Sequence, residues 1–236
     1  VLLMIFGIVA HSVCAQISLD KLRSNAVKAQ DVINGKNLSE DQVAKGLKEA
    51  LILGTTISVK NISKPGGFNN NYLIRIPFPE DALKMKEKLL KIGMNKQIER
   101  FEHVLNEAAE DASNYAKEIF INAIFNMTIQ DAMSILKGDD AAATNYLSNQ
   151  TSQELFVKFN PIISNSIKKV NLTKYWRNLV ESYNKIPFTN PVNPDLDVYV
   201  TNQTINGLFV MIRVEEKKIR NSPEARVSEI LQKVFK

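Results

Sequence analysis

The feature that most constrains the fold of this chain is a helical repeat of apolar residues, which runs from Leu19 almost to the C-terminus. Apolar side chains recur every three or four residues, the spacing that places them on one face of an α-helix. Ser39 with Gln42, and Thr128 with Asp131, match the capping-box pattern that starts helices. We therefore predict an all-α fold, a single bundle-like domain of about eight to ten helices.

One segment interrupts this pattern. Residues 64–79 read KPGGFNNNYLIRIPFP. Pro-Gly-Gly favours a turn, and Ile76 and Phe78 each precede a proline, which pushes them out of the helical region of backbone space. We expect one long, ordered and partly buried extended loop, with or without a short strand. Loops of this length in compact domains are often functional.

The helices after this loop have recognisable features. Apolar residues at alternating steps of three and four over residues 98–119 indicate a seam between packed helices. Thr151 with Glu154 matches another helix start. A long helix is expected from about Leu196 to Arg220.

The N-terminus has the pattern of a secretory signal peptide. Residues 1–10 form an uncharged apolar run, which is shorter than the roughly 20 residues that span a bilayer. Val13 and Ala15 suit the two positions before a cleavage site, which we place after Ala15. Val13 directly before Cys14 disfavours a lipoprotein, because a smaller residue usually precedes a lipidated cysteine.

The chain is therefore expected to have three parts. Residues 1–15 are predicted to be the signal peptide, residues 16–38 an N-terminal helical segment, and residues 39–236 the helical domain. We expect the mature protein to be exported to the periplasm or the cell exterior.

Cleavage after residue 15 leaves few reactive side chains. Cys14 is the only cysteine of the chain, and His103 is the only histidine that remains. The usual zinc sites and di-iron bundle sites need more of these residues. There is no P-loop, dinucleotide fingerprint or nucleophile elbow. The Asp139-Asp140 and Asp195-Asp197 pairs suit helix N-caps better than a calcium loop. We expect no cofactor and no metal.

The formal net charge of +5 is spread along the chain. Such a charge gives mild attraction to anionic surfaces and is too diffuse to indicate nucleic-acid binding. The partners we expect are a protein or a small amphipathic ligand, with weak association to an anionic membrane surface and no nucleic acid.

Five polar residues are candidates for a ligand-binding site. Glu102, Asn106 and Glu110 repeat every four residues beside an apolar seam, as either a solvated face or a site. Glu215 falls on an apolar position of the last long helix, so we expect a half-buried carboxylate that needs a partner. Arg75 lies among apolar loop residues, and its planar guanidinium suits a carboxylate. We predict that Arg75 pairs with Glu215 or Glu102, either as a structural latch or in a pocket for an anionic ligand.

Several segments carry a family resemblance. GGFNNNYLIRIPFP, FNPII and LDVYVTNQTINGLFVMIRVEEKKIR resemble the bacterial domain-of-unknown-function 4197 family, and the similarity extends from about residue 40 to the C-terminus. The resemblance implies a helical and usually exported protein. It implies no activity.

Three functional hypotheses follow. The first is an exported, non-enzymatic binding or interaction module. The second is a carrier of an apolar or amphipathic anionic ligand, which requires a cavity between helices with Arg75 or lysines at its rim. The third is a hydrolytic enzyme that uses carboxylates such as Glu102, Glu110 and Glu215, which requires two of them to converge on an open cleft.

Overall fold

The computed structural model describes residues 38–169, 172–188, 196–226 and 232. The predicted signal peptide and nearly all of the predicted N-terminal segment lie outside these residues. The described part of the chain contains no strand, and its helical elements are α2 (Glu40–Ile62), η1 (Glu80–Ala82), α3 (Leu83–Lys91), α4 (Asn95–Ser113), α5 (Ala116–Phe125), α6 (Ile129–Lys137), α7 (Ala142–Lys169), α8 (Leu172–Asn184), α9 (Leu196–Asn221) and η2 (Pro223–Ala225). The predicted all-α fold of about eight to ten helices is confirmed.

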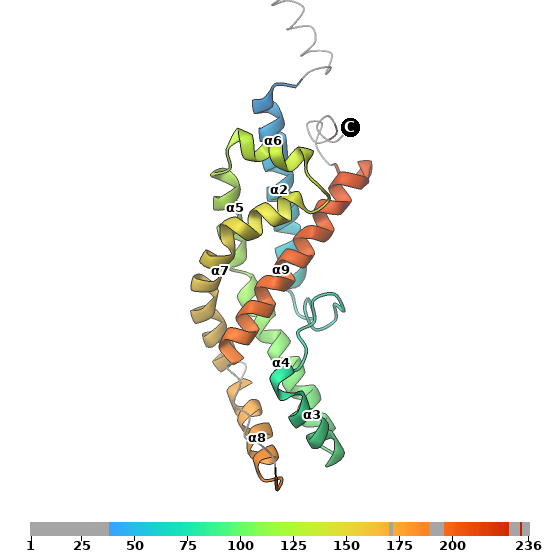
Figure 1. The fold of residues 1–236 in the computed structure, drawn as a ribbon, viewed down its shortest axis with the longest axis vertical. Coiled ribbons are helices and arrows are strands. Elements are labelled where there is room, and N and C mark those ends of the chain that lie inside the picture. The colour runs from blue at the N-terminus through green and yellow to red at the C-terminus, as the bar shows by residue number, and fades with distance from the viewer. Residues whose placement is uncertain (1–37, 170–171, 189–195, 227–231, 233–236) are drawn as a thin grey trace, which may run out of the picture.

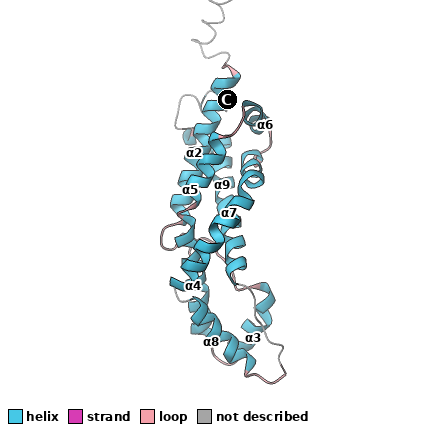
Figure 2. Cartoon of the chain, turned by 90° about the vertical axis from the view of Figure 1, so that its left-hand side faces the viewer, coloured by secondary structure: helices cyan, strands magenta, loops and turns pink. Residues whose placement is uncertain are grey.

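The helices form an elongated bundle (Figures 1 and 2). Helix α9 runs through its middle and packs against α7, α2 and α4. Helices α2, α5 and α6 pack together toward one end, and α3 and α8 lie at the other end beside α4. Within the described residues no single helix is long and apolar enough to cross a membrane, although α5 and α6, bent by 104°, meet the length and composition criteria as a pair.

Local sequence signals explain several helix ends. Both predicted capping boxes are present: Ser39 with Gln42 starts α2, and Thr128 with Asp131 starts α6. The Thr128 hydroxyl and backbone N–H both bond to the Asp131 carboxylate, which lowers the pKa of Asp131. Gly93, with φ of +84°, follows α3 in the left-handed conformation that glycine adopts without strain.

Two predicted helix boundaries are wrong. The seam over residues 98–119 belongs to two helices, because the chain breaks between α4 and α5, and Tyr115 at the break is exposed. Thr151 does not start a helix. Its hydroxyl donates to the Leu147 carbonyl oxygen at 2.7 Å, one turn back within the continuous α7. A threonine can make this bond inside a helix as well as cap one, so the motif alone was ambiguous.

The predicted long loop is confirmed and occupies residues 63–79, between α2 and η1. It runs through consecutive turns up to residue 74 and contains no strand. Four of its apolar side chains lie in the core, because Phe68, Ile74, Ile76 and Phe78 are all buried. The ring of Phe78 packs against Phe101 and Trp176, with centroid distances of 5.0 and 5.9 Å. This 63–79 loop is therefore an integral layer of the bundle.

Candidate functional site

Three of the five predicted site residues form one polar stripe on α4, and the stripe faces the 63–79 loop. Glu102, Asn106 and Glu110 are successive at intervals of four, so they share a helix face. Asn106 is fully buried, Glu110 is 6% exposed, and the Glu102 side chain is 13% exposed. The interpretation of this stripe as a solvated face is therefore wrong, because the loop covers it.

Asn106 pairs with the backbone of Ile76. Its Oδ1 accepts a hydrogen bond from the Ile76 N–H at 2.8 Å, and its Nδ2 donates to the Ile76 carbonyl oxygen at 3.0 Å and to that of Glu102 at 2.8 Å. Buried backbone groups need partners. The side-chain amide of Asn106 provides partners for both backbone groups of Ile76, as a neighbouring strand does in a β-sheet.

Glu110 holds the start of the loop. Its carboxylate accepts hydrogen bonds from the backbone N–H groups of Gly66 and Phe68, both at 3.0 Å, and of Asn69 at 3.1 Å. The two glycines make this turn possible. Gly66 has φ of +80°, and a Cβ on Gly67 would lie 2.3 Å from the Ile62 carbonyl oxygen. The Pro-Gly-Gly turn therefore aims three donors at one carboxylate.

Glu102 carries the predicted ion pair with Arg75. Arg75 Nη2 lies 3.2 Å from Glu102 Oε2, and Lys86 Nζ contacts the other carboxylate oxygen. The Arg75 side chain is 48% exposed, so solvent screens the pair, and it contributes about 0–1 kcal/mol to stability. The Glu102 alternative is confirmed, and this contact adds a third attachment of the loop to α4.

Glu215 does not join this group. It is buried, more deeply than the half-burial we predicted, and its partner is Lys218, at 2.7 Å on the same helix. Its Cβ lies 3.7 Å from the position that a Cβ on Gly54 of α2 would occupy. The alternative pairing of Arg75 with Glu215 is wrong. Arg75 lies beside α4, where it meets Glu102. Glu215 lies at a different interface, the one between α9 and α2.

Helix α9 holds the other side of the loop. The Tyr199 hydroxyl donates to the Pro77 carbonyl oxygen at 2.8 Å. Burial of the phenol, together with the nearby charges of Glu80 and Glu102, raises the pKa of Tyr199 to about 12. A Cβ on Gly207 would lie 2.7 Å from the Phe68 ring, so this glycine permits the close approach of loop and helix.

Glu216 was not among the predicted site residues. Its carboxylate accepts hydrogen bonds from the backbone N–H groups of Ala143 and Thr144, both at 2.9 Å, and from the Thr144 hydroxyl at 2.7 Å. Arg220 pairs with the same carboxylate and also donates to the Ile135 carbonyl oxygen. Glu216 thus joins α9 to the start of α7 and the end of α6. The sequence pattern that could have identified Glu216 is its position four residues before Arg220 on a long helix.

The turn of the loop that faces away from α4 presents two side chains to solvent, and we call Tyr72 and Leu73 the loop tip. Tyr72 is 90% exposed and Leu73 is 48% exposed. The turn itself is fixed: Asn71 Oδ1 accepts the Leu73 N–H at 3.1 Å, and the Asn71 carbonyl oxygen accepts the N–H groups of Ile74 and Arg75. A stable backbone therefore displays an exposed aromatic ring.

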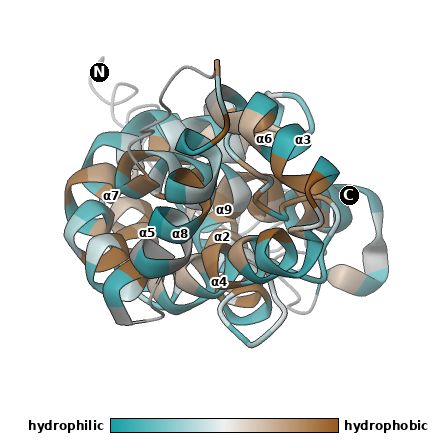
Figure 3. Ribbon diagram, turned by 90° about the horizontal axis from the view of Figure 1, so that it is seen from below, coloured by the Kyte–Doolittle hydropathy of each residue, from teal (hydrophilic) through white to brown (hydrophobic). Residues whose placement is uncertain are grey.

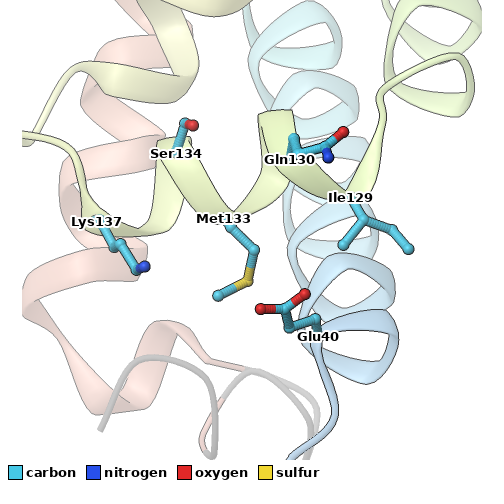
Figure 4. Close-up of a pocket in the computed structure, with 6 residues that line it drawn as sticks. All are labelled: Glu40, Ile129, Gln130, Met133, Ser134 and Lys137. Atoms are coloured by element: carbon cyan, nitrogen blue, oxygen red, sulfur yellow. The ribbon is translucent and has the colours of Figure 1, made fainter.

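A separate surface pocket of about 510 Å³ lies between α6 and the start of α2 (Figure 4). Met133 and Ile129 supply its apolar wall, and Glu40 and Lys137 place one charge of each sign on it. None of the five predicted site residues lines it. Its rim has a lysine, as the carrier hypothesis requires, but the pocket lies at the surface and also carries a carboxylate.

The described residues contain no group of three or more potential metal ligands among His, Cys, Asp and Glu. Asp139 accepts the Ala141 N–H at 2.9 Å near the start of α7, as expected of a helix-capping residue. Asp195 lies outside the described residues. His103 is partly exposed and lies 3.8 Å from Glu107 on the same helix.

Comparison with known proteins identifies a family and no function. A family model described as a protein of unknown function (DUF4197) matches residues 37–236. The match spans most of the chain, which therefore belongs to this family. No curated protein and no solved structure matches the chain.

Proposed function

We propose that this member of the DUF4197 family is an exported, non-enzymatic interaction module, and that its binding surface is the loop tip. The observation that carries the proposal is the contrast between a firmly held loop and its exposed end. Asn106, Glu110 and Tyr199 bond to the loop backbone, and Glu102 pairs with the Arg75 side chain. Tyr72 and Leu73 nevertheless point into solvent. The apolar run of residues 1–10 supports export.

A rigid loop favours binding because it has little conformational entropy to lose. Association is weakened by the ordering of loops and side chains, so a loop that is already rigid binds more tightly for the same contacts. Tyrosine is enriched at the centres of protein interfaces, because its ring gives a large contact area with few rotatable bonds. Tyr72, a tyrosine on a fixed turn, matches both requirements.

The carboxylates give the enzyme hypothesis less support. Glu110 is engaged by three backbone N–H groups, Glu102 by two cations and Glu215 by Lys218. Glu102 and Glu110 lie beneath the loop, and Glu215 lies at another interface. Because the residues do not converge on an open cleft, the latch interpretation of Arg75 is the better supported one.

The proposal can be tested by site-specific photo-crosslinking in the native host. The full chain would carry p-benzoylphenylalanine in place of Tyr72, and in the control in place of Tyr115, which is also an exposed tyrosine but lies at the α4–α5 break. We expect a discrete protein adduct from position 72, lost when Leu73→Asp is added, and none from position 115. The proposal fails if position 72 gives no more adduct than position 115, or if Leu73→Asp leaves the adduct unchanged.

A second variant tests the role of loop attachment. Glu110→Gln removes the charge that holds Gly66, Phe68 and Asn69, whereas Glu107→Gln changes an exposed carboxylate on the same helix. Hydrogen exchange of the loop amides should rise in Glu110→Gln alone. The yield of the position-72 adduct should fall in parallel with the loss of protection.

The surface pocket supports a carrier function as the second candidate, since about 510 Å³ would hold a small amphipathic molecule. Native mass spectrometry of the gently purified protein would detect such a ligand as extra mass that disappears on denaturation. Met133→Trp should fill the pocket and abolish the extra mass. A bare protein mass in both samples would remove the support for this function.

A further inference from the structure

The end of the molecule farthest from α6 carries an arrangement that the interaction proposal does not use. The C-terminal ends of α3 and α8 both lie there, and each is followed by a turn (Figures 1 and 2). Lys88 of α3 and Tyr183 of α8 link the two helices near these ends, because the Lys88 Nζ lies 5.8 Å from the centre of the Tyr183 ring. Figure 3 views the molecule from this side, and α3 shows hydrophobic segments next to hydrophilic ones.

Each turn exposes a large apolar side chain. Ile92, just beyond the end of α3, is 57% exposed, and Phe188, four residues after α8, is completely exposed. Phe188 also has φ of +63°, a left-handed conformation that bulky residues rarely adopt. Core packing does not account for this strained and exposed phenylalanine, which makes it a candidate for a functional role.

Lysines surround these apolar side chains. Lys91 and Lys96 flank the first turn, and Lys185 precedes Phe188, all three exposed. The sequence contains no Asp or Glu from residue 88 to residue 98, or from residue 182 to residue 188. The nearest acidic residues in the sequence, Glu87, Glu99 and Glu181, lie within α3, α4 and α8. We call this surface the basic end, and it comprises Leu90, Lys91, Ile92, Lys96, Lys185 and Phe188.

We infer that the basic end docks on an anionic lipid bilayer. The two apolar side chains would enter the interface between headgroups and acyl chains, and the lysines would contact anionic headgroups. This pairing of a few protruding apolar groups with a basic surround matches the two attractions that hold peripheral proteins on membranes. Neither attraction is sufficient alone, since a few apolar side chains or a few charges bind weakly.

The inference is testable with a probe that reports on this end alone. In the full chain with Cys14→Ser, Ile92→Cys would be labelled with the polarity-sensitive fluorophore NBD. The control label would replace Val157, an exposed apolar residue on α7. Because the readout is local, attachment of the chain through its apolar N-terminal run would not mimic it.

We expect a blue shift and intensity increase at position 92 with vesicles of phosphatidylglycerol and phosphatidylcholine, and no change with phosphatidylcholine alone or at position 157. Each lysine near an anionic surface contributes about fivefold in affinity, so the triple variant Lys91→Gln/Lys96→Gln/Lys185→Gln should bind about 100-fold more weakly. The matched control Lys45→Gln/Lys117→Gln/Lys158→Gln removes three exposed lysines from α2, α5 and α7 and should bind within a few-fold of the parent. Phe188→Ser should weaken binding about tenfold or more.

Three results would overturn the inference. The first is no spectral change at position 92 with anionic vesicles. The second is equal loss of binding in the two triple-lysine variants, which would indicate a general charge effect. The third is a response to polyglutamate without a response to vesicles, which would identify an acidic protein surface as the partner.

Discussion

The side-chain amide of Asn106 hydrogen-bonds to both backbone polar groups of Ile76, at 2.8 and 3.0 Å. Both residues are buried, so water cannot replace either bond. The contact joins a loop to a helix 30 residues later in the chain. It is the central attachment of a loop that Glu102 and Glu110 hold on either side.

Replacing Asn106 should therefore destabilise the whole domain. Asn106→Leu leaves the N–H and carbonyl of Ile76 buried without this partner, and we expect the free energy of unfolding to fall by about 2–4 kcal/mol. The matched control is Asn114→Leu at the C-terminal end of the same helix, because Asn114 is exposed and its side-chain hydrogen bond, to the Asp111 carbonyl oxygen, is local. Urea denaturation would measure both, and equal losses would contradict the role assigned to Asn106.

Two helical glycines should respond in opposite directions to alanine. Gly207→Ala places a Cβ 2.7 Å from Phe68, so we expect a loss of about 1–3 kcal/mol. At Gly54 the nearest atoms would be 3.7 Å away, so Gly54→Ala should stabilise by about 0.5–1 kcal/mol.

A double mutant checks the cause of the Gly207 effect. Phe68→Leu removes the ring atoms that the new Cβ would meet, so Gly207→Ala should destabilise less in that background than in the wild type. Thermal denaturation of the four proteins gives the coupling. An additive result would mean that the loop and α9 do not meet as closely as Gly207 indicates.

Glu216 should matter more than its neighbour Glu215. Glu216→Gln removes the charge that Arg220 pairs with at 2.9 Å and weakens the cap of α7, and we expect a loss of about 3 kcal/mol. Glu215→Gln affects an ion pair whose lysine is mostly in solvent, so this substitution should lower the free energy of unfolding by less than about 1 kcal/mol. Denaturant titration of the two variants would settle the order, and the reverse order would be inconsistent with these contacts.

Alkaline pH should weaken the attachment of the loop to α9. The pKa of Tyr199 is raised from 10.0 to about 12, so the folded state favours the neutral phenol. This contribution is complete below pH 10 and is lost as the pH rises toward 12. Because the phenol is only partly buried, we expect it to amount to about 1 kcal/mol.

The comparison protein for this pH effect is Tyr199→Phe. It lacks the bond to Pro77 and should be less stable at neutral pH, but its stability should fall less between pH 10 and 12. Denaturation at several pH values gives the difference between the two proteins. Parallel pH profiles would show that Tyr199 does not contribute.

Some features of the fold could be predicted because their causes are local. The capping boxes at Ser39 and Thr128 act within one helical turn, so their sequence patterns sufficed. The Pro-Gly-Gly turn at residues 65–67 likewise needs a backbone that only glycine adopts readily. Thr151 shows the limit of such motifs, since the same hydroxyl that could cap a helix bonds one turn back inside α7.

The candidate site was only partly predictable. Arg75 needed a carboxylate, and the sequence offered Glu102 and Glu215 without a means to choose between them. The stripe of Glu102, Asn106 and Glu110 was visible as a period of four, but a solvated face has the same period. Glu216 was missed because its partners, Ala143 and Thr144, lie more than 70 residues away in the chain.

The sequence by itself determined the helical class, the main helix starts and the position of the long loop, because these depend on side chains and backbones a few residues apart. The tertiary structure decided which face of α4 is covered, which carboxylate meets Arg75, and which turns lie at the basic end. Those outcomes depend on how α9 packs against α2, α4 and α7 and on how α8 packs against α3 and α4. That packing sums many weak contacts between residues that are distant in the chain, so no local pattern records it.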